Sequence, residues 1–130
     1  MFGNARSKAW RLIPVALLVN GAAADDSQTP VIHVTLGDYQ FNPAEITVGV
    51  GNPVVLELQN VDAITPHNFT LKDDEAGLDV TISVPAGSIK QITLTPSVAG
   101  AYTFYCNKKL PFMKSHRDRG MQGTLVVAPE

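Results

Sequence analysis

From Val31 onward the chain consists of short segments in which apolar and polar residues alternate, separated by turns rich in Gly, Pro and Asn. In the first segment, Ile32, Val34 and Leu36 fall on one face and His33 on the other. A period of two is typical of half-buried β-strands, and no segment shows a convincing helical period. Strands are expected at 31–36, 45–48, 54–59, 69–71, 79–84, 89–95, 101–105 and 124–127. Strands at this spacing predict an all-β fold, an antiparallel sandwich or barrel.

The first 24 residues have the layout of a secretory signal peptide. Three basic residues precede an apolar stretch at Leu12–Val19, and small residues at Ala22–Ala24 provide a cleavage site before Asp25. This stretch is much shorter than the roughly 20 residues that span a bilayer, so a membrane anchor is the weaker interpretation. We therefore expect a signal peptide at 1–24 and one domain at 25–130. The mature protein is expected to be exported, periplasmic if bacterial, and without a transmembrane segment.

Charge excludes one class of partner. The whole chain of 130 residues has a formal charge of −2, from ten basic and twelve acidic residues. Loss of the signal peptide would remove three of the basic residues and none of the acidic ones, leaving seven against twelve, a charge of −5. A nucleic-acid-binding protein needs a basic surface, so nucleic acid is not expected as a partner. A single small domain is expected to be a monomer.

The single cysteine, Cys106, points to the chemistry. An exported protein with one cysteine cannot form an internal disulfide, so this thiol is buried, paired elsewhere or used. Cys106 follows one expected strand and Met121 precedes the last one, with His116 in the loop between them. His67 enters an earlier strand.

Two histidines, a cysteine and a weakly bound methionine make a blue-copper site, because imidazole suits both oxidation states and sulfur favours Cu(I). The sequence thus predicts one copper ion, cycling between Cu(I) and Cu(II), with His67, Cys106, His116 and Met121 as ligands. A cysteine nucleophile with a histidine base is an alternative. That interpretation leaves Met121 and the second histidine unexplained.

Other candidate residues receive simpler interpretations. Met113 could substitute as a ligand but is expected to form part of an apolar loop surface. His33 lies on the polar face of its strand and is expected to be solvated. Asn68 begins a glycosylation acceptor sequence, which we treat as a chance match. Five cations in the loop form either a solvated face or a docking patch. These are Lys108, Lys109, Lys114, Arg117 and Arg119.

The last third of the chain resembles the cupredoxin family, in which a strand ending Tyr-x-Phe-x-Cys leads to His-x4-Met and a Gly-Thr-Leu-x-Val strand. The matching residues are Tyr102, Phe104, Cys106, His116, Gly120, Met121, Gly123, Thr124, Leu125 and Val127. Pro66-His67-Asn68 is similar to the first-ligand segment of plastocyanins, where the asparagine ties the ligand loops together. Tyr39-x-Phe41-x-Pro43 resembles the family's N-terminal half. The resemblance implies a single antiparallel Greek-key β-sandwich.

One departure from the family pattern concerns the ligand loop. Plastocyanins and azurins usually place two to four residues between the cysteine and the second histidine, whereas nine, Asn107–Ser115, stand here. The entropy of closing a loop grows slowly with its length, so His116 can still reach the metal. The longer loop could alter the geometry of the site and its access to solvent.

A protein with such a copper site could have one of three functions. The first is a one-electron carrier that exchanges electrons with redox partner proteins. The second is a copper-binding protein for delivery, storage or resistance, with copper-handling proteins as partners. The third, an enzyme, needs further histidines for a second copper site. The chain has three histidines, and the proposed site leaves only His33. An enzyme is therefore not expected.

Overall fold

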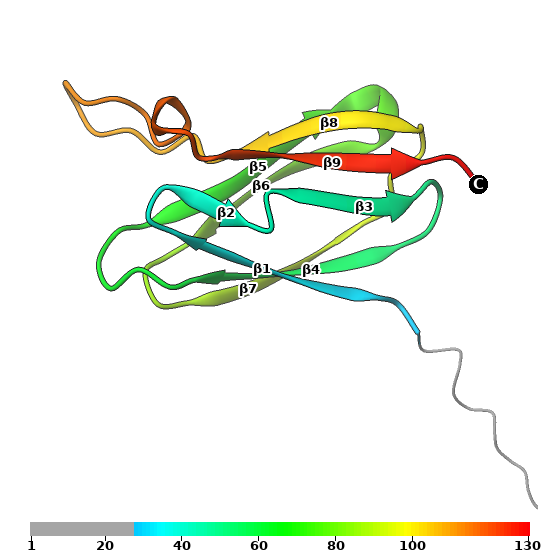
Figure 1. The fold of residues 1–130 in the computed structure, drawn as a ribbon, viewed down its shortest axis with the longest axis horizontal. Helices are drawn as coiled ribbons and strands as arrows, with labels where there is room; N and C mark the ends of the chain where they lie inside the picture. Colours follow the sequence, from blue (N-terminus) through cyan, green and yellow to red (C-terminus); the bar gives the residue numbers. More distant parts are fainter. Residues whose placement is uncertain (1–27) are drawn as a thin grey trace, which may run out of the picture.

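The computed structural model describes residues 28–130 as a sandwich of two β-sheets (Figure 1). One sheet has four strands in the order β2 (Gln40–Asn42), β1 (Val31–Gly37), β4 (Val54–Asn60) and β7 (Ile89–Leu94). The other has five, in the order β3 (Glu45–Gly49), β9 (Gln122–Ala128), β8 (Gly100–Tyr105), β5 (His67–Asp73) and β6 (Leu78–Val84). The all-β sandwich expected from the alternating pattern is confirmed.

Two strand pairs differ from the antiparallel expectation. β1 runs parallel to β4, and β3 runs parallel to β9; the other pairs are antiparallel. After β1 and β2 the chain crosses to the second sheet as β3 and returns to the first as β4. Parallel neighbours require a crossover of this kind. An alternating pattern has the same period in both directions, so it could not distinguish them.

The sandwich core is anchored by three phenylalanines beneath one end of the sheets. Phe69 and Phe104 stack with ring centroids 5.0 Å apart, and Phe41 packs edge-on against both. Burying each ring contributes roughly 1.5–3 kcal/mol. Phe69 lies two residues after His67, and Phe104 lies two residues before Cys106. Side chains two residues apart share a face of a strand. The packing of Phe69 and Phe104 therefore also fixes the segments that carry His67 and Cys106.

Gly123 allows β9 to approach its neighbours closely. A Cβ atom at this position would collide with the Phe104 ring and the carbonyl oxygen of Ala44. The same carbonyl accepts a hydrogen bond from the backbone N–H of Thr124 at 2.8 Å. A side chain at position 123 would therefore push β9 away from the ring that supports Cys106.

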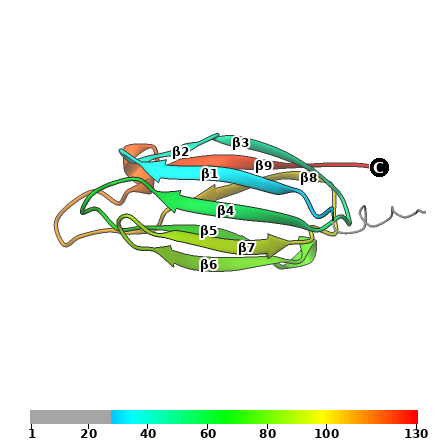
Figure 2. The same cartoon turned by 90° about the horizontal axis from the view of Figure 1, so that it is seen from below.

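The long connection from β8 to β9 projects from one end of the sandwich, coloured orange in Figure 1. Figure 2 shows it at the end where β1 and β4 also finish. Its only regular element is a short 3₁₀ turn, η4 (Arg117–Arg119); a second such turn, η3 (Asp74–Ala76), joins β5 to β6. Within residues 28–130 no helix is long and apolar enough to cross a bilayer. The expected signal peptide, 1–24, lies outside the described residues.

Candidate metal centre

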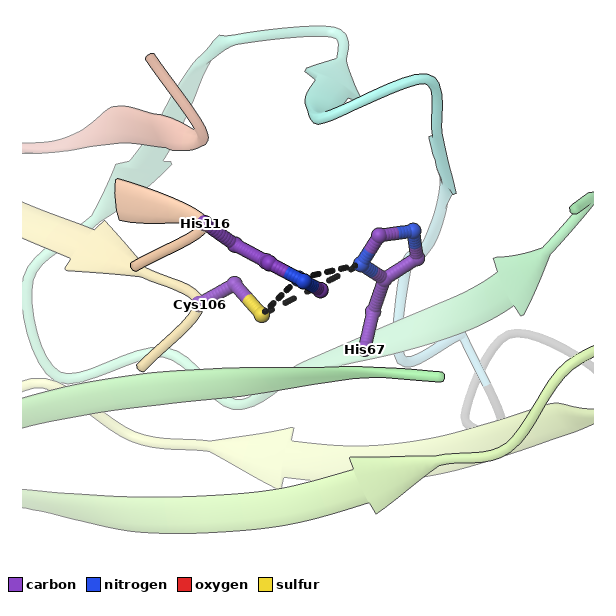
Figure 3. Close-up of side chains that lie close together, drawn as sticks. All are labelled: His67, Cys106 and His116. Carbon is purple, nitrogen blue, oxygen red and sulfur yellow. Dashed lines mark hydrogen bonds between the residues drawn. The ribbon is translucent and has the colours of Figure 1, made fainter. Parts of the chain in front are cut away.

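Three side chains from separate parts of the sequence meet at this end of the sandwich (Figure 3). His67 is the first residue of β5, Cys106 follows β8 directly, and His116 precedes η4. The Nδ1 atoms of the two histidines are 3.2 Å apart. The Cys106 Sγ lies 3.5 Å from Nδ1 of His116 and 4.0 Å from Nδ1 of His67. Three of the four expected ligands therefore present donor atoms to one point.

Burial removes these donors from water. His67 and Cys106 are fully buried, and His116 is 8% exposed. Burial raises the pKa of the Cys106 thiol, while backbone N–H groups of Lys108 and Asn68 oppose that shift. Burial, and then the neighbouring His67, lower the pKa of His116. Burial thus favours the neutral thiol of Cys106 and the neutral imidazole of His116, and a metal cation binding here would take the place of the thiol proton.

Asn68 connects the segments that carry His67 and Cys106. Its side-chain Nδ2 donates to Oδ1 of Asn107, and its Oδ1 accepts from the backbone N–H of Asn107 at 2.9 Å. The backbone N–H of Asn68 also donates to the Cys106 Sγ at 3.3 Å. The tie implied by the family resemblance is confirmed. Asn68 is 5% exposed, so its side chain is committed to this network.

Backbone hydrogen bonds close the long loop near its base. The N–H of His116 donates to the carbonyl of Lys108 at 2.8 Å, so residues 109–115 project beyond this contact. Arg117 stacks on the ring of Tyr105 at 4.1 Å, and Arg119 lies 4.9 Å from the ring centroid of Tyr39. The nine-residue spacing thus lengthens the outer part of the loop. His116 still reaches the other two side chains.

Met121 is fully buried beside the cluster. Its backbone N–H donates to the carbonyl of His116 at 3.0 Å, and its carbonyl accepts from the N–H of Cys106 at 3.2 Å. Gly120, with φ of 101°, makes the turn that lets Met121 fold back in this way. Met121 is therefore bonded through its backbone to two of the cluster residues. Its role as a ligand stays a prediction.

Met113 and His33, the two further candidates, have the surroundings that the sequence predicted. Met113 is 47% exposed on the outer part of the loop. The ring of His33 is largely exposed and its Nδ1 lies 2.6 Å from Oε1 of Glu57. Met113 thus contributes to an exposed apolar surface, and His33 is solvated and paired.

Comparison with known proteins agrees with this geometry. A family model described as the cupredoxin-like domain matches residues 11–127. The chain belongs to the cupredoxin-like family. No curated protein sequence matches it significantly.

Solved structures share the fold of this cupredoxin. An auracyanin from Roseiflexus castenholzii has a TM-score of 0.62 at 19% identity, covering 78% of this chain and 98% of its own. Auracyanin A, a blue copper protein from Chloroflexus aurantiacus, has a TM-score of 0.58 at 24% identity, with coverages of 76% and 99%. The metal-binding domain of a Cu(I)-exporting ATPase from Streptococcus pneumoniae scores 0.56 at 17% identity, with coverages of 75% and 84%.

The donors present in this cupredoxin fit a single copper ion. Copper accepts imidazole nitrogen and thiolate as ligands in both oxidation states. The pocket supplies two imidazoles and one cysteine sulfur. Each residue offers one donor atom, and these atoms all lie within 4.8 Å of one another. All three residues are buried, which keeps bulk water from the donor atoms.

Sequence reasoning missed two residues that contact the histidines. Asp62 places Oδ2 2.7 Å from Nε2 of His67. The ring of Tyr39 packs edge-on against His67 and His116, with centroids 6.2 and 4.9 Å away. Tyr39 was part of the family resemblance, but nothing in the sequence indicated this contact. Asp62 belongs to no motif, and only the fold brings it to His67.

Proposed function

We propose that this cupredoxin is a one-electron carrier with a single type 1-like copper site, in which His67, Cys106, His116 and Met121 hold the metal. The observation that carries the proposal is the convergence of three buried donor atoms from β5, the end of β8 and the clamped loop. Copper, when bound, supplies the one-electron couple between Cu(I) and Cu(II). Because the donors are fixed by strands and hydrogen bonds, they need to move little when the charge of the metal changes.

Electron exchange with another protein requires a ligand near the surface. His116 lines a groove of about 420 Å³ together with Tyr39, Pro66, Leu110 and the two lysines that follow Asn107. His116 is the most exposed of the three clustered residues. A partner that covers this groove would come closest to the metal through the His116 ring.

The surface around the groove is apolar and basic. Its exposed apolar side chains include Ile64, Leu110, Phe112 and Met113. Five of the seven basic residues between 28 and 130 lie in the loop 107–120, on a protein whose overall charge is negative. We call this surface, made by Ile64 and the loop 107–120, the loop patch. Its charge favours a redox partner with an acidic surface, because complementary charge accelerates encounter.

Small redox reagents of known charge test the loop patch directly. We expect hexacyanoferrate(III), a trianion, to oxidise the Cu(I) protein faster than a cationic cobalt complex of similar driving force. The Lys109→Gln variant should slow hexacyanoferrate roughly threefold at low ionic strength, and the difference should vanish at high salt. Stopped-flow absorbance measures both rates.

Lys72→Gln is the matched control, since Lys72 is an exposed lysine on β5 that pairs with Asp79 at 3.0 Å. This substitution removes the same charge outside the loop patch, and the hexacyanoferrate rate should stay close to that of the wild type. Equal slowing by both variants would show that only the overall charge acts, and would contradict electron exchange through the loop patch.

Copper handling is the second candidate function. The exposed Met113 and the long loop favour it, because a flexible thioether on the surface could pass Cu(I) to another protein. The two functions differ in what leaves the site. A carrier should exchange electrons rapidly while a competing Cu(I) chelator removes copper slowly. A copper-delivery protein should release Cu(I) quickly, and Met113→Leu should slow that release.

An enzymatic role has less support than electron transfer. Among residues 28–130, the cluster of His67, Cys106 and His116 is the one group of potential metal-binding side chains that the structure brings together. His33, the remaining histidine, pairs with Glu57.

We also propose that the protein is exported, on the basis of the N-terminal sequence. Cleavage after Ala24 would remove all three basic residues that precede the domain. N-terminal sequencing of the protein from its native host is expected to start at or near Asp25. Recovery of a chain that begins at Met1 from the cytoplasm would contradict export.

A further inference from the structure

Asp62 stands directly behind one of the proposed copper ligands. It lies in the connection between β4 and β5, and its Oδ2 is 2.7 Å from Nε2 of the fully buried His67. In Figure 3 the Nδ1 of His67 faces Cys106 and His116, while the second ring nitrogen points away from them. Asp62 therefore contacts the side of the ring that is turned away from the cluster.

We propose that Asp62 is a positioning residue for the metal site, with two effects. It holds His67 in the tautomer and orientation that present Nδ1 to copper, and it places a negative charge behind the ligand that favours Cu(II) over Cu(I). This inference rests on the proposed function in that it assigns His67 as a copper ligand. No motif or family resemblance in the sequence pointed to Asp62.

The tautomer follows from hydrogen-bond chemistry. An ionised carboxylate only accepts hydrogen bonds, so the 2.7 Å contact requires the proton of neutral His67 to be on Nε2. Nδ1 then carries the lone pair, and it is Nδ1 that lies 3.2 Å from His116 and 4.0 Å from Cys106. Carboxylates that accept from the second nitrogen of a metal-bound histidine fix ring orientation and raise ligand basicity.

Asp62 is itself held in place by hydrogen bonds to its carboxylate and to its backbone. The backbone N–H of Asp38 donates to both of its oxygens, at 3.2 and 3.3 Å. The backbone N–H of Asp62 donates to Oδ1 of Asn60 at 2.9 Å. Asn60 is buried and donates to the carbonyls of Thr65 and Val84, both at 2.9 Å. Asp62 is thus positioned before any metal binds.

The turn that supplies Asp38 is conformationally demanding. Asp38 and Tyr39 join β1 to β2 with φ values of 52° and 59°, in the left-handed region that favours glycine. Backbone strain of this kind tends to persist where it serves a site. Here the same turn aims the Asp38 N–H at Asp62 and the Tyr39 ring at both histidines. Glycine at these positions would supply the turn but not the aromatic ring.

The charge of Asp62 acts differently on the two oxidation states. The carboxylate is about a quarter exposed, so solvent screens it only in part. Cu(II) carries one more positive charge than Cu(I) and is stabilised more by a nearby anion. Removing the charge should therefore weaken Cu(II) binding more than Cu(I) binding, and the reduction potential should rise.

Two substitutions separate charge from orientation. Asp62→Asn keeps an acceptor oxygen for Nε2–H and removes the charge; Asp62→Ala removes both. For Asp62→Asn we expect the ratio of Cu(II) to Cu(I) affinity to fall roughly tenfold, which is about 59 mV in potential for one electron. For Asp62→Ala we expect Cu(II) affinity to fall roughly 10–100-fold. Glu75→Gln is the matched control, because it removes a carboxylate from the exposed η3 turn, at the end of β5 opposite His67.

The metal-free protein gives a readout that does not depend on copper. Long-range ¹H–¹⁵N NMR spectra of the imidazole rings should show the Nε2–H tautomer for His67 in the wild type and in Asp62→Asn. In Asp62→Ala a mixture with the Nδ1–H tautomer is expected. Amide spectra and melting curves of each variant check that it is folded.

The outcomes separate this inference from the proposed function. An Nδ1–H tautomer in the wild type, or an Asp62→Asn potential equal to that of Glu75→Gln, would overturn the role of Asp62. A wild-type protein that shows the expected tautomer but gives no copper–thiolate absorption would instead overturn the proposed function, and would leave Asp62 as a residue that orients His67 alone.

Discussion

The Cys106→Ser protein is expected to show no intense visible absorption when loaded with Cu(II). The absorption of the wild-type site would come from charge transfer between the cysteine thiolate and the metal, and a serine hydroxyl does not ionise near neutral pH to take its place. Cys106 is fully buried and its sulfur accepts a hydrogen bond from Asn68, so serine should fit with little change in packing. Optical titration with Cu(II) measures the loss.

Substitutions at the other proposed ligands should have smaller effects in a fixed order. His116→Gly should retain copper with an altered spectrum, and added imidazole should partly restore it, because the opened position lies beside the groove. Met121→Leu should retain the band and raise the potential, since a weak donor to Cu(II) is lost. Met113→Leu is the control for Met121, and it should change neither property. A spectrum changed by Met113→Leu but not by Met121→Leu would contradict the assignment of Met121.

Copper binding is expected to stabilise the fold strongly. The three clustered donors come from separate segments and are brought together only in the native state, so the unfolded chain should bind copper much more weakly. At free copper about a thousand times Kd the stabilisation is roughly 4 kcal/mol. For a domain of this size each kcal/mol raises Tm by about 4–8 °C. Calorimetry with and without copper measures the difference.

The control for this stabilisation is the same experiment on Cys106→Ser and on the zinc-loaded wild type. The serine variant should lose most of the copper effect, while zinc, which also accepts nitrogen and sulfur ligands, should retain part of it. Equal midpoints for the copper-free and copper-loaded wild type would show that no preformed site exists, whatever the spectrum.

The sandwich and the three clustered residues, His67, Cys106 and His116, could be predicted from the sequence for a physical reason. Alternation at residues such as Val34 and Leu36 reports which face of a strand is buried, and both are fully buried. Cys106 and His67 lie at the ends of such strands, so the expected sheets already placed them near one pole. The parallel directions of β1 and β4 and of β3 and β9 left no trace in the alternation, and they were the part of the fold that needed correction.

The remaining features depend on contacts between distant residues. The backbone hydrogen bond between His116 and Lys108 decides how the nine-residue spacing is accommodated, and no sequence pattern predicts such a bond. Asp62 reaches His67 because Asp38, in the connection between β1 and β2, and Asn60, at the end of β4, hold it. Aspartate in a loop is ordinarily interpreted as a solvated turn residue, so the contact of Asp62 with His67 was visible only in the structure.

The central claim is most directly tested by one optical experiment on the wild-type protein. Addition of Cu(II) should produce an intense visible band that saturates at one copper per chain, disappears with ascorbate and returns with hexacyanoferrate(III). This result would show a copper–thiolate site that passes one electron reversibly. Absence of the band at one equivalent, or a band that ascorbate bleaches and hexacyanoferrate(III) cannot restore, would contradict a blue-copper electron carrier.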